Sequence, residues 1–382
     1  MNEKSNEYVE FGSIVLKAAN EQDVLQNIEE LSKVHEILYV WRFVEVGNEV
    51  LVEHDFTRPI DFRTGFFTKA RLERFINRPW KLEGGRLARY SLLNDGEKYQ
   101  LVSAWHHIIV DEYCGLLFSD QLKSLVNSSK TVKDFPVPRR YLELAQVEAK
   151  MMAEEGEELR SWWKDFLDDG NAITFKECRE FVNTQGREEI VVGKKLFDMK
   201  AFAKNTNLSN FEIVQGLFAL WASKYFHVEK NMVIAGPYSL RNSYNFGTTF
   251  GYFVSQTLYK YNTGKLKNFS VVKYLKWSSR MVNHSHKYSK YTYPKINALY
   301  PAKIWDDITF CWWNHSTQNF DEFPVSAKTP LSFGALVLET GSLELSVLFR
   351  EQQFDRISIV NMLESFCVFL SKTRKNTSSV SV

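Results

Sequence analysis

The chain alternates between strand-like and helix-like sequence patterns along almost all of its 382 residues. In the helix-like segments apolar residues recur every three or four positions, as from Val24 to Val34. Both halves mix the two kinds of pattern in similar proportion. We therefore expect an α/β (α+β) protein with two lobes, an N-terminal lobe of residues 1–168 and a C-terminal lobe of residues 169–382, divided near Asp169–Gly170.

The expected elements follow from the spacing of apolar residues and from turn signals. Strand patterns cover residues 11–18, 37–46, 49–56, 87–94, 98–107, 188–197, 231–236, 248–261, 307–314 and 331–350. Helical patterns cover about 20–38, 68–78, 112–126, 140–168, 208–225, 269–283 and 355–372.

Composition excludes several classes of protein. The chain is 44% hydrophobic and 25% charged, which is typical of a globular protein with a substantial core. It has no N-terminal signal pattern and no apolar run of 18 residues, so we expect a cytoplasmic protein without a membrane span. The four cysteines are far apart, without metal-ligand spacing, and are interpreted as reduced thiols: Cys114, Cys178, Cys311 and Cys367.

Charge is distributed unevenly, although the net charge is only +2. No acidic residue stands between Glu229 and Asp306, a stretch with twelve lysines and arginines, whereas residues 147–170 are acid-rich. The basic stretch indicates an acidic partner or a phosphate-bearing ligand, or else a solvated face whose charge the acidic stretch balances. We see no nucleic-acid-binding module and expect no nucleic-acid partner.

The segment SAWHHIIVDEYCG, residues 103–115, places two adjacent histidines at the end of a predicted strand. The strand belongs to a predicted hairpin turned at Asp95–Gly96. A helix follows, with Asp111 as its expected N-cap. Short rigid connections therefore hold His106, His107 and Asp111, which suits a site that requires accurate geometry.

A neutral imidazole is suited to accepting a proton at neutral pH. A histidine pair is also compatible with a purely structural role. A zinc site lacks a third ligand at short spacing, and the Gly-x-Ser-x-Gly pattern of a serine hydrolase is absent. If Asp111 is buried, it requires a cationic partner or a shifted pKa.

The segment from His106 to Asp111 has the form HHxxxD, and the chain around it resembles the condensation domains of nonribosomal peptide synthetases. These domains belong to the chloramphenicol acetyltransferase-like acyltransferases. Further segments resemble family motifs in the family's order: VHEIL…RF at 34–43, INRPWKLEGGRLARYSLL at 76–93, VIAGPYSLRN at 233–242, FGYFVSQTL at 250–258, and LELSVLFREQQFDRISIVNMLESF at 343–366.

The resemblance implies two chloramphenicol acetyltransferase-like lobes in a V-shaped pseudo-dimer with a tunnel between them. A donor acyl thioester on the phosphopantetheine arm of a carrier protein would meet an amine acceptor there, with no bound cofactor or metal. His107 would accept a proton from the amine or position it. His106 would be structural, and Asp111 would hold the loop through a salt bridge to Arg241. We expect a monomer.

Other residues are candidates for positions near the substrate. They include Glu112, where the family usually has glycine, and Ser255, where it usually has asparagine, together with Tyr113 and Asn314. The family's N-terminal SxAQxRxWFL segment is not recognisable in this sequence, and we expect no attached adenylation or carrier domain. We therefore expect a stand-alone enzyme of secondary metabolism that meets its partners by diffusion.

Three alternatives to amide formation stay open at this point. The chain could be a catalytically silent relative that recruits a carrier protein or a partner enzyme, a reading that Glu112 and the missing segment favour. It could use coenzyme A thioesters as donors. It could form an ester with an alcohol acceptor, since the same base would serve.

Overall fold

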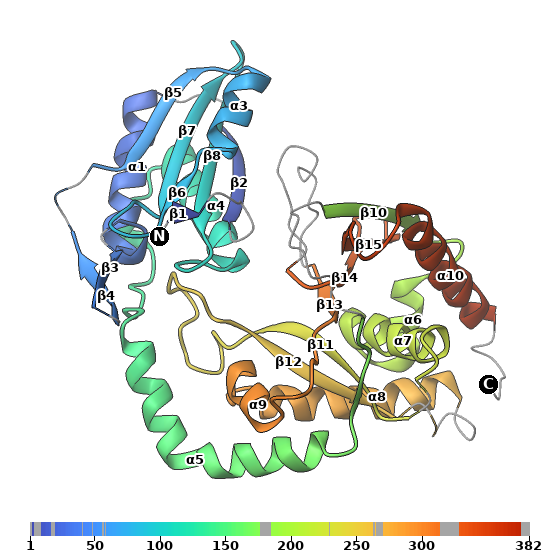
Figure 1. The fold of residues 1–382 in the computed structure, drawn as a ribbon. Helices are drawn as coiled ribbons and strands as arrows, with labels where there is room; N and C mark the ends of the chain where they lie inside the picture. The colour runs from blue at the N-terminus through green and yellow to red at the C-terminus, as the bar shows by residue number, and fades with distance from the viewer. Residues whose placement is uncertain are drawn as a thin grey trace. The chain divides into compact units, whose positions relative to one another are not determined.

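The computed structural model describes most of the chain (Figure 1). The described residues are 2–3, 9–16, 20–39, 41–47, 49–55, 57, 59–175, 185–228, 230–262, 264, 270–313 and 328–375. Their contacts divide the chain into two compact units. Unit 1 comprises the described residues up to Met151 and the segment Leu240–Val254; unit 2 comprises Met152–Ser239 and the described residues from Ser255 onward.

Unit 1 is built on a four-stranded sheet with the strand order β2-β8-β7-β5. β8 is antiparallel to both of its neighbours, whereas β7 and β5 are parallel. Its strands are β2 (Val9–Leu16), β5 (Asp61–Phe66), β7 (Ala88–Asn94) and β8 (Tyr99–His106), and its main helices are α1 (Glu21–Val34), α3 (Lys69–Ile76) and α4 (Glu112–Asn127).

Both faces of the central hairpin of this sheet are buried. Side chains alternate between the faces of a strand, so neighbouring residues enter different cores. Leu92 and Leu101 pack in the core that includes α1 and α4. Leu93 and Val102 pack in a second core with Phe75 of α3. The continuous apolar runs of β7 and β8 therefore fit a strand pair covered on both sides.

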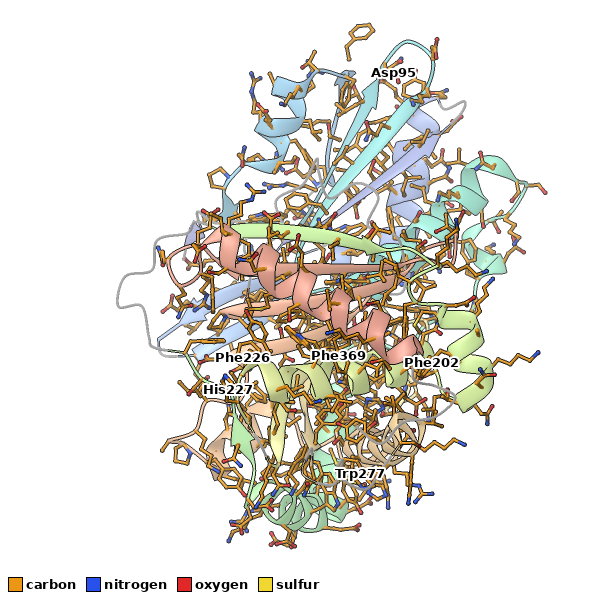
Figure 2. All side chains as sticks on the ribbon, turned by 90° about the vertical axis from the view of Figure 1, so that its right-hand side faces the viewer. Asp95, Phe202, Phe226, His227, Trp277 and Phe369 are labelled. Atoms are coloured by element: carbon orange, nitrogen blue, oxygen red, sulfur yellow. The ribbon has the colours of Figure 1, made fainter. Side chains whose placement is uncertain are left out.

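The turn of this hairpin is the predicted one. Asp95 lies at its tip (Figure 2), and its carboxylate accepts backbone hydrogen bonds from Glu97 at 3.0 Å and Lys98 at 2.9 Å. Gly96 has a φ of 99°, in the left-handed region that glycine adopts without steric cost. The hairpin fixes the end of β8, where the histidine pair begins.

Unit 2 is built on a mixed sheet with the order β10-β15-β14-β13-β11-β12, and β9 pairs with β11. The β10/β15 and β14/β15 pairs are antiparallel, and the β13/β14 and β11/β13 pairs are parallel. The strands are β9 (Asn171–Ala172), β10 (Gln185–Val192), β11 (Met232–Ser239), β12 (Val254–Tyr261), β13 (Ile308–Trp312), β14 (Leu331–Val337) and β15 (Leu343–Arg350). The main helices are α7 (Asn210–Tyr225), α8 (Val271–Lys287) and α10 (Arg356–Lys375).

The core of unit 2 surrounds α7, which is buried along most of its length from Ile213 onward. A helix that is apolar on all sides is expected only in such a position. Phe202 lies within this core, and Phe226 and Phe369 pack against it (Figure 2). The ring of Phe218 on α7 packs against that of Phe333 on β14, with ring centroids 4.7 Å apart, so the helix is held against the sheet.

The remaining elements are short, apart from α5 (Glu143–Leu167), which contains the boundary between the units. β1 pairs with β6 and β3 pairs with β4. These elements are β1 (Asn2–Glu3), α2 (Glu36–Tyr39), β3 (Trp41–Val46), β4 (Glu49–His54), β6 (Trp80–Lys81), the 3-10 turn η1 (Val132–Asp134), α6 (Met199–Thr206) and α9 (Tyr293–Leu299).

The mixed α/β fold and its two-part organisation agree with the sequence prediction. The predicted division after residue 168 differs from the observed one, which falls after Met151 and returns Leu240–Val254 to unit 1. The strand predicted over 248–261 is wrong in its first six residues, since β12 begins at Val254. Phe250 explains the difference, because its side chain is buried in the core of unit 1. The V-shaped arrangement and the tunnel stay predictions.

The sequence patterns also missed β5, α6 and α9, each of which is at most eight residues long. None of the helices in the described ranges combines the length and the hydropathy that crossing a membrane requires. The C-terminal tail after residue 375 and Cys178 lie outside the described residues.

Candidate functional site

The histidine pair lies where β8 ends and the chain turns toward α4. The backbone amide of Ile109 donates to the carbonyl of His106 at 3.1 Å, which closes a tight turn. His106 is 5% exposed, and its Nδ1 accepts a hydrogen bond from the Ile108 amide at 3.2 Å. Its ring meets the edge of Trp80, with centroids 5.9 Å apart. These contacts fit the structural role expected for His106.

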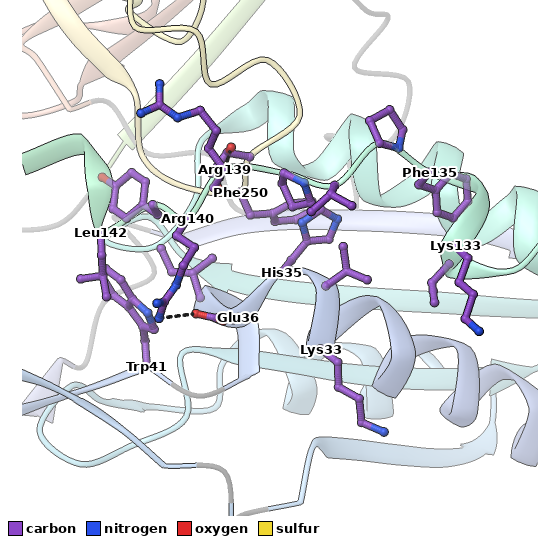
Figure 3. A pocket seen from close by; sticks show the side chains of 18 residues that line it. Lys33, His35, Glu36, Trp41, Lys133, Phe135, Arg139, Arg140, Leu142 and Phe250 are labelled. Atoms are coloured by element: carbon purple, nitrogen blue, oxygen red, sulfur yellow. Dashed lines mark hydrogen bonds and ion pairs between the residues drawn. The ribbon is translucent and has the colours of Figure 1, made fainter. Parts of the chain in front are cut away.

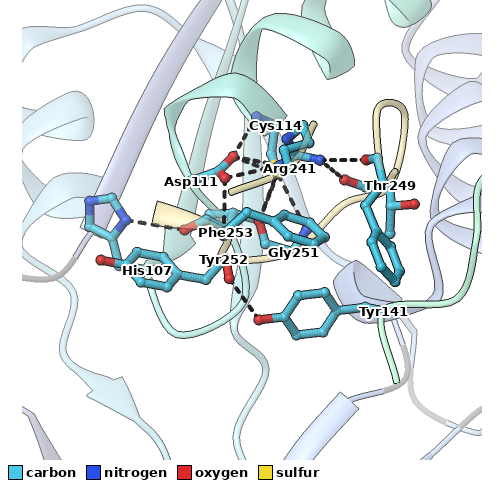
Figure 4. Close-up of polar contacts among 11 residues, drawn as sticks. His107, Asp111, Cys114, Tyr141, Arg241, Thr249, Gly251, Tyr252 and Phe253 are labelled. Atoms are coloured by element: carbon cyan, nitrogen blue, oxygen red, sulfur yellow. Dashed lines mark hydrogen bonds and ion pairs between the residues drawn. The ribbon is translucent and has the colours of Figure 1, made fainter. Parts of the chain in front are cut away.

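Asp111 is the N-cap of α4 and is buried, at 2% exposure. The side chain accepts from the Cys114 amide at 3.3 Å, as the sequence predicts for an N-cap. Nη2 of Arg241 lies 2.8 Å from Oδ1 and 2.9 Å from Oδ2 of Asp111 (Figure 4). The ion pair implied by the resemblance is therefore present, across 130 residues of sequence.

Arg241 is itself held from several sides. Its guanidinium donates to the backbone carbonyls of Thr249 and Phe246, and its Cζ lies 4.3 Å from the Phe253 ring centroid. The Phe253 amide donates to Oδ2 of Asp111 at 3.2 Å. The pair thus ties the start of α4 to the segment between β11 and β12, and each buried charge has a partner.

Cys114 completes this buried cluster. Its Sγ lies 3.3 Å from Oδ1 of Asp111 and 3.4 Å from the carbonyl oxygen of Gly251. Burial, followed by the neighbouring carboxylate of Asp111, raises the pKa of the thiol to about 12. A thiol in this state is a structural group and a poor nucleophile.

Cys114 should therefore resist alkylation in the folded protein. Since the thiolate is the reactive form, we expect iodoacetamide at pH 8 to modify Cys114 at least about 100-fold more slowly in the native chain than in urea. Peptide mass spectrometry with timed quenching measures both rates. Equal rates in the folded and unfolded chains would show that the cluster around Asp111 opens readily.

His107 follows His106 and points in a different direction. Its Nδ1 lies 3.1 Å from the carbonyl oxygen of Val110 (Figure 4). Its Nε2 lies 2.6 Å from Oε1 of Glu10, on β2. The Tyr252 ring stands edge-on at a centroid distance of 6.0 Å. His107 is therefore held on both ring nitrogens, with 12% of its side chain exposed.

Sequence reasoning missed Glu10. Nothing in its local sequence sets it apart, and it stands almost a hundred residues before His107. The contact results from the antiparallel pairing of β2 with β8, in which Glu10 lies opposite Trp105 and Val9 lies opposite His106. A correct strand pairing would have placed Glu10 beside the end of β8, but the sequence pattern alone does not supply a register.

The other predicted site residues belong to different parts of the chain. Glu112 and Tyr113 lie in the first turn of α4 and are exposed, and the Tyr113 ring lies 4.7 Å from the Arg241 guanidinium. Ser255 belongs to unit 2, where its hydroxyl accepts from the Tyr293 amide at 3.2 Å. Asn314 lies outside the described residues.

The segment beside His107 is held by the residues that precede α5. The Tyr141 hydroxyl donates to the carbonyl of Tyr252 at 2.8 Å (Figure 4). The Thr249 hydroxyl donates to the carbonyl of Arg139 at 3.0 Å. The backbone around Tyr252 is therefore fixed independently of His107.

The basic stretch is partly balanced within unit 2. Lys290 lies 3.2 Å from Glu155, and Lys260 lies 2.8 Å from Asp169. Both carboxylates belong to the acid-rich stretch, as the internal pairing considered from the sequence expects. Lys276 and Arg280 remain exposed on one face of α8.

Unit 1 also contains a cavity of about 310 Å³, formed around His35, Trp41, Tyr141 and Phe250 (Figure 3). The His35 ring lies 4.0 Å from that of Phe250, and its Nε2 contacts Gln121 Oε1 at 2.8 Å. Its Nδ1 has no hydrogen-bond partner among the described residues. Burial lowers the pKa of His35 to about 4.

One buried and one partly buried histidine predict a loss of stability in mild acid. Burial lowers the pKa of both His35 and His286 to about 4, whereas an unfolded histidine has a pKa of about 6.5. Between these values the unfolded chain binds protons that the folded chain does not. The free energy of unfolding should therefore fall as pH falls from 6.5 to 4, by at most about 1.4 kcal/mol per pH unit for each histidine.

Urea unfolding at pH 7 and pH 5 measures this effect. The His35→Gln variant should show a shallower pH dependence, and His284→Gln, which changes an exposed histidine of α8, should match the unaltered chain. An unfolding midpoint that does not change between the two pH values would show that these imidazoles are not buried in the neutral form.

The chain is similar in sequence to known proteins. A sequence model of the family described as Condensation domain matches residues 3–381. Bacitracin synthase 3 from Bacillus licheniformis is 22% identical over 232 residues, which make up 53% of this chain. The matched region covers only 4% of the length of bacitracin synthase 3.

Solved structures share the fold at low sequence identity. The first condensation domain of the calcium-dependent antibiotic synthetase, in complex with a substrate analogue, has a TM-score of 0.79 and 12% identity, with 99% of this chain and 93% of that chain covered. The X-domain from teicoplanin biosynthesis, in complex with OxyB, also has a TM-score of 0.79 and 12% identity, with 98% and 90% covered.

Proposed function

Because the chain belongs to the condensation-domain family, we propose that it transfers an acyl or aminoacyl group from a carrier protein to an amine. The donor is a thioester on the carrier's phosphopantetheine arm, and the product is an amide in secondary-metabolite biosynthesis. The observation that carries this proposal is the position of His107, on a turn fixed by the buried Asp111–Arg241 pair.

Amide formation from a thioester requires little chemical activation by the protein. A thioester is already activated, so the main task is to align the amine with its carbonyl carbon. A positioned base adds roughly 10²–10⁴-fold. His107 serves in this role, either as base or as the group that positions the amine. Its bond to Val110 fixes the ring, and Asp111 and Arg241 hold the turn without contacting substrate.

An acidic carrier protein is the partner that the charge pattern favours. Lys276 and Arg280 are exposed, four residues apart on α8. Such a face attracts an acidic domain and speeds its association at low salt. The phosphate of the carrier's phosphopantetheine arm is also negatively charged, so the basic face attracts it as well.

A second candidate function is recruitment without catalysis. Glu112 favours it, since the family usually has glycine after the aspartate. The structurally similar X-domain was solved in complex with another protein, OxyB. In this role the chain would bind a carrier or an enzyme and leave the thioester intact.

A comparison of two acyl donors tests the proposed transfer from a carrier protein. The same acyl group is offered as a carrier-bound thioester and as a coenzyme A thioester, and amide product is measured together with carrier binding. Faster transfer from the carrier supports the proposed function. Equal transfer from coenzyme A makes the chain a coenzyme A-dependent acyltransferase, and binding without transfer supports the recruiting role.

A further inference from the structure

The cavity of unit 1 is large enough for a small molecule. Its volume of about 310 Å³ lies at the lower end of the range found for ligand sites in proteins. The residues that line it all belong to unit 1, and they come from the end of α1, from α2 and β3, from the residues between α4 and α5, and from Thr249 and Phe250. His107 is not among them. The cavity is therefore separate from the proposed site of acyl transfer.

Aromatic side chains form part of the cavity wall (Figure 3). The ring centroids of Trp41 and Tyr141 are 5.6 Å apart, and those of His35 and Phe250 are 4.0 Å apart. Phe135 lines the cavity as well. A flat apolar group can stack against such rings, and an aromatic contact contributes more than the apolar area that it buries. The wall therefore favours a ligand with an aromatic body.

Two of the cations that line the cavity already have partners. Arg139 forms an ion pair with Glu143 at 2.9 Å, and Arg140 forms one with Glu36 at 3.2 Å. His35 adds no charge at pH 7, because burial lowers its pKa to about 4. The charge that a ligand could balance must therefore come from other side chains.

Lys33 and Lys133 supply this positive charge. Lys33 stands in the last turn of α1 and Lys133 in η1, two elements that are in contact, and Figure 3 shows both side chains on the side of the cavity away from Trp41. Both are exposed, and neither has a carboxylate partner in the described part of the chain. The neighbouring carboxylate of Asp134 accepts from the Thr131 amide at 2.7 Å instead. A negatively charged group is attracted to such a pair of lysines.

We propose that this cavity binds a small aromatic carboxylate, with its ring system against the aromatic wall and its carboxylate toward Lys33 and Lys133. The volume of the cavity suits one small molecule and is too small for a folded partner domain. Binding involves no covalent step. The proposal does not depend on acyl transfer, so its test is independent of the test of the proposed function.

Three indole compounds of similar size test the class of ligand. Indole-3-acetate is an anion, indole-3-acetamide is neutral and tryptamine is a cation. With about 13 non-hydrogen atoms, indole-3-acetate should bind with a Kd of about 1 mM or tighter. The amide should bind about 3–10-fold more weakly, and tryptamine more weakly still. Nitrogen-15 NMR of the Trp41 indole N–H, assigned with the Trp41→Phe variant, measures each Kd and reports that the compound is in this cavity.

A double variant, Lys33→Gln with Lys133→Gln, tests the role of the two lysines. We expect it to bind indole-3-acetate about 3–10-fold more weakly than the unaltered chain and to bind the amide equally well. Lys98→Gln is the matched control, since it removes an exposed lysine of unit 1 that does not line the cavity. It should leave the Kd of both compounds unchanged.

Two results would overturn the inference. One is a Trp41 indole resonance that does not move at about 10 mM indole-3-acetate, a concentration well above the expected Kd. The other is an affinity that does not depend on charge, seen as equal binding of the three compounds or as unchanged binding of indole-3-acetate in the double variant. The cavity would then have no preference for a carboxylate.

Discussion

The Arg241→Ala variant should lose about 3–5 kcal/mol of its free energy of unfolding, together with most of its activity. Arg241 is 3% exposed and is the cationic partner of Asp111, so its removal leaves a carboxylate buried at 2% exposure without its charge partner. Breaking a buried pair from one side costs this much because the remaining charge stays desolvated. The variant also loses the bonds to the Thr249 and Phe246 carbonyls.

Urea unfolding measures the loss, with Arg160→Ala as control. Arg160 forms an exposed ion pair with Glu157 at 3.3 Å, and its removal should change the free energy of unfolding by less than about 1 kcal/mol. Activity should fall in Arg241→Ala because the turn that carries His107 depends on Asp111. Unchanged stability in Arg241→Ala would mean that the buried pair does not exist in solution.

The His107→Ala variant should have the opposite profile, with activity lost and the fold kept. We expect acyl transfer to fall by about 10²–10⁴-fold, the contribution of a positioned base. Stability should fall much less than in Arg241→Ala, because His107 is not fully buried and the Glu10 side chain, 29% exposed, can be hydrated after its removal. The measurement is kcat/KM for acyl transfer, followed beside the thermal unfolding temperature.

His106→Ala is the matched comparison, since it changes the neighbouring residue of the same type. His106 is 5% exposed and packs against Trp80, so its loss should lower the unfolding temperature. Near-normal turnover in His107→Ala would remove His107 from the mechanism. A large fall in its unfolding temperature would make the role structural.

The sequence predicted the parts of the site that local chemistry determines. Asp95–Gly96 sets the hairpin, because the carboxylate and the glycine close the turn within four residues. Asp111 begins α4, because its side chain satisfies the free amide of Cys114. These interactions involve residues that are near in sequence, so a pattern of residue types is enough to recognise them.

The sequence did not predict the parts that depend on distant contacts. Glu10 reaches His107 through strand pairing, and its identity as a charged strand residue gives no hint of this. Residues 248–253 have a strand-like composition because all of them except Gly251 are threonine or aromatic, yet Phe250 is buried in unit 1. The Asp111–Arg241 pair was expected only through the family resemblance, since no local rule links residues 130 positions apart.

The most direct test of the central claim is intact-mass spectrometry of an acyl-loaded carrier protein, incubated with this chain and a candidate amine. The account predicts that the carrier loses the mass of the acyl group while an amide of the amine appears in equal amount. A carrier that stays loaded at the rate seen without the chain, although binding is measured, would contradict acyl transfer by the His107 site.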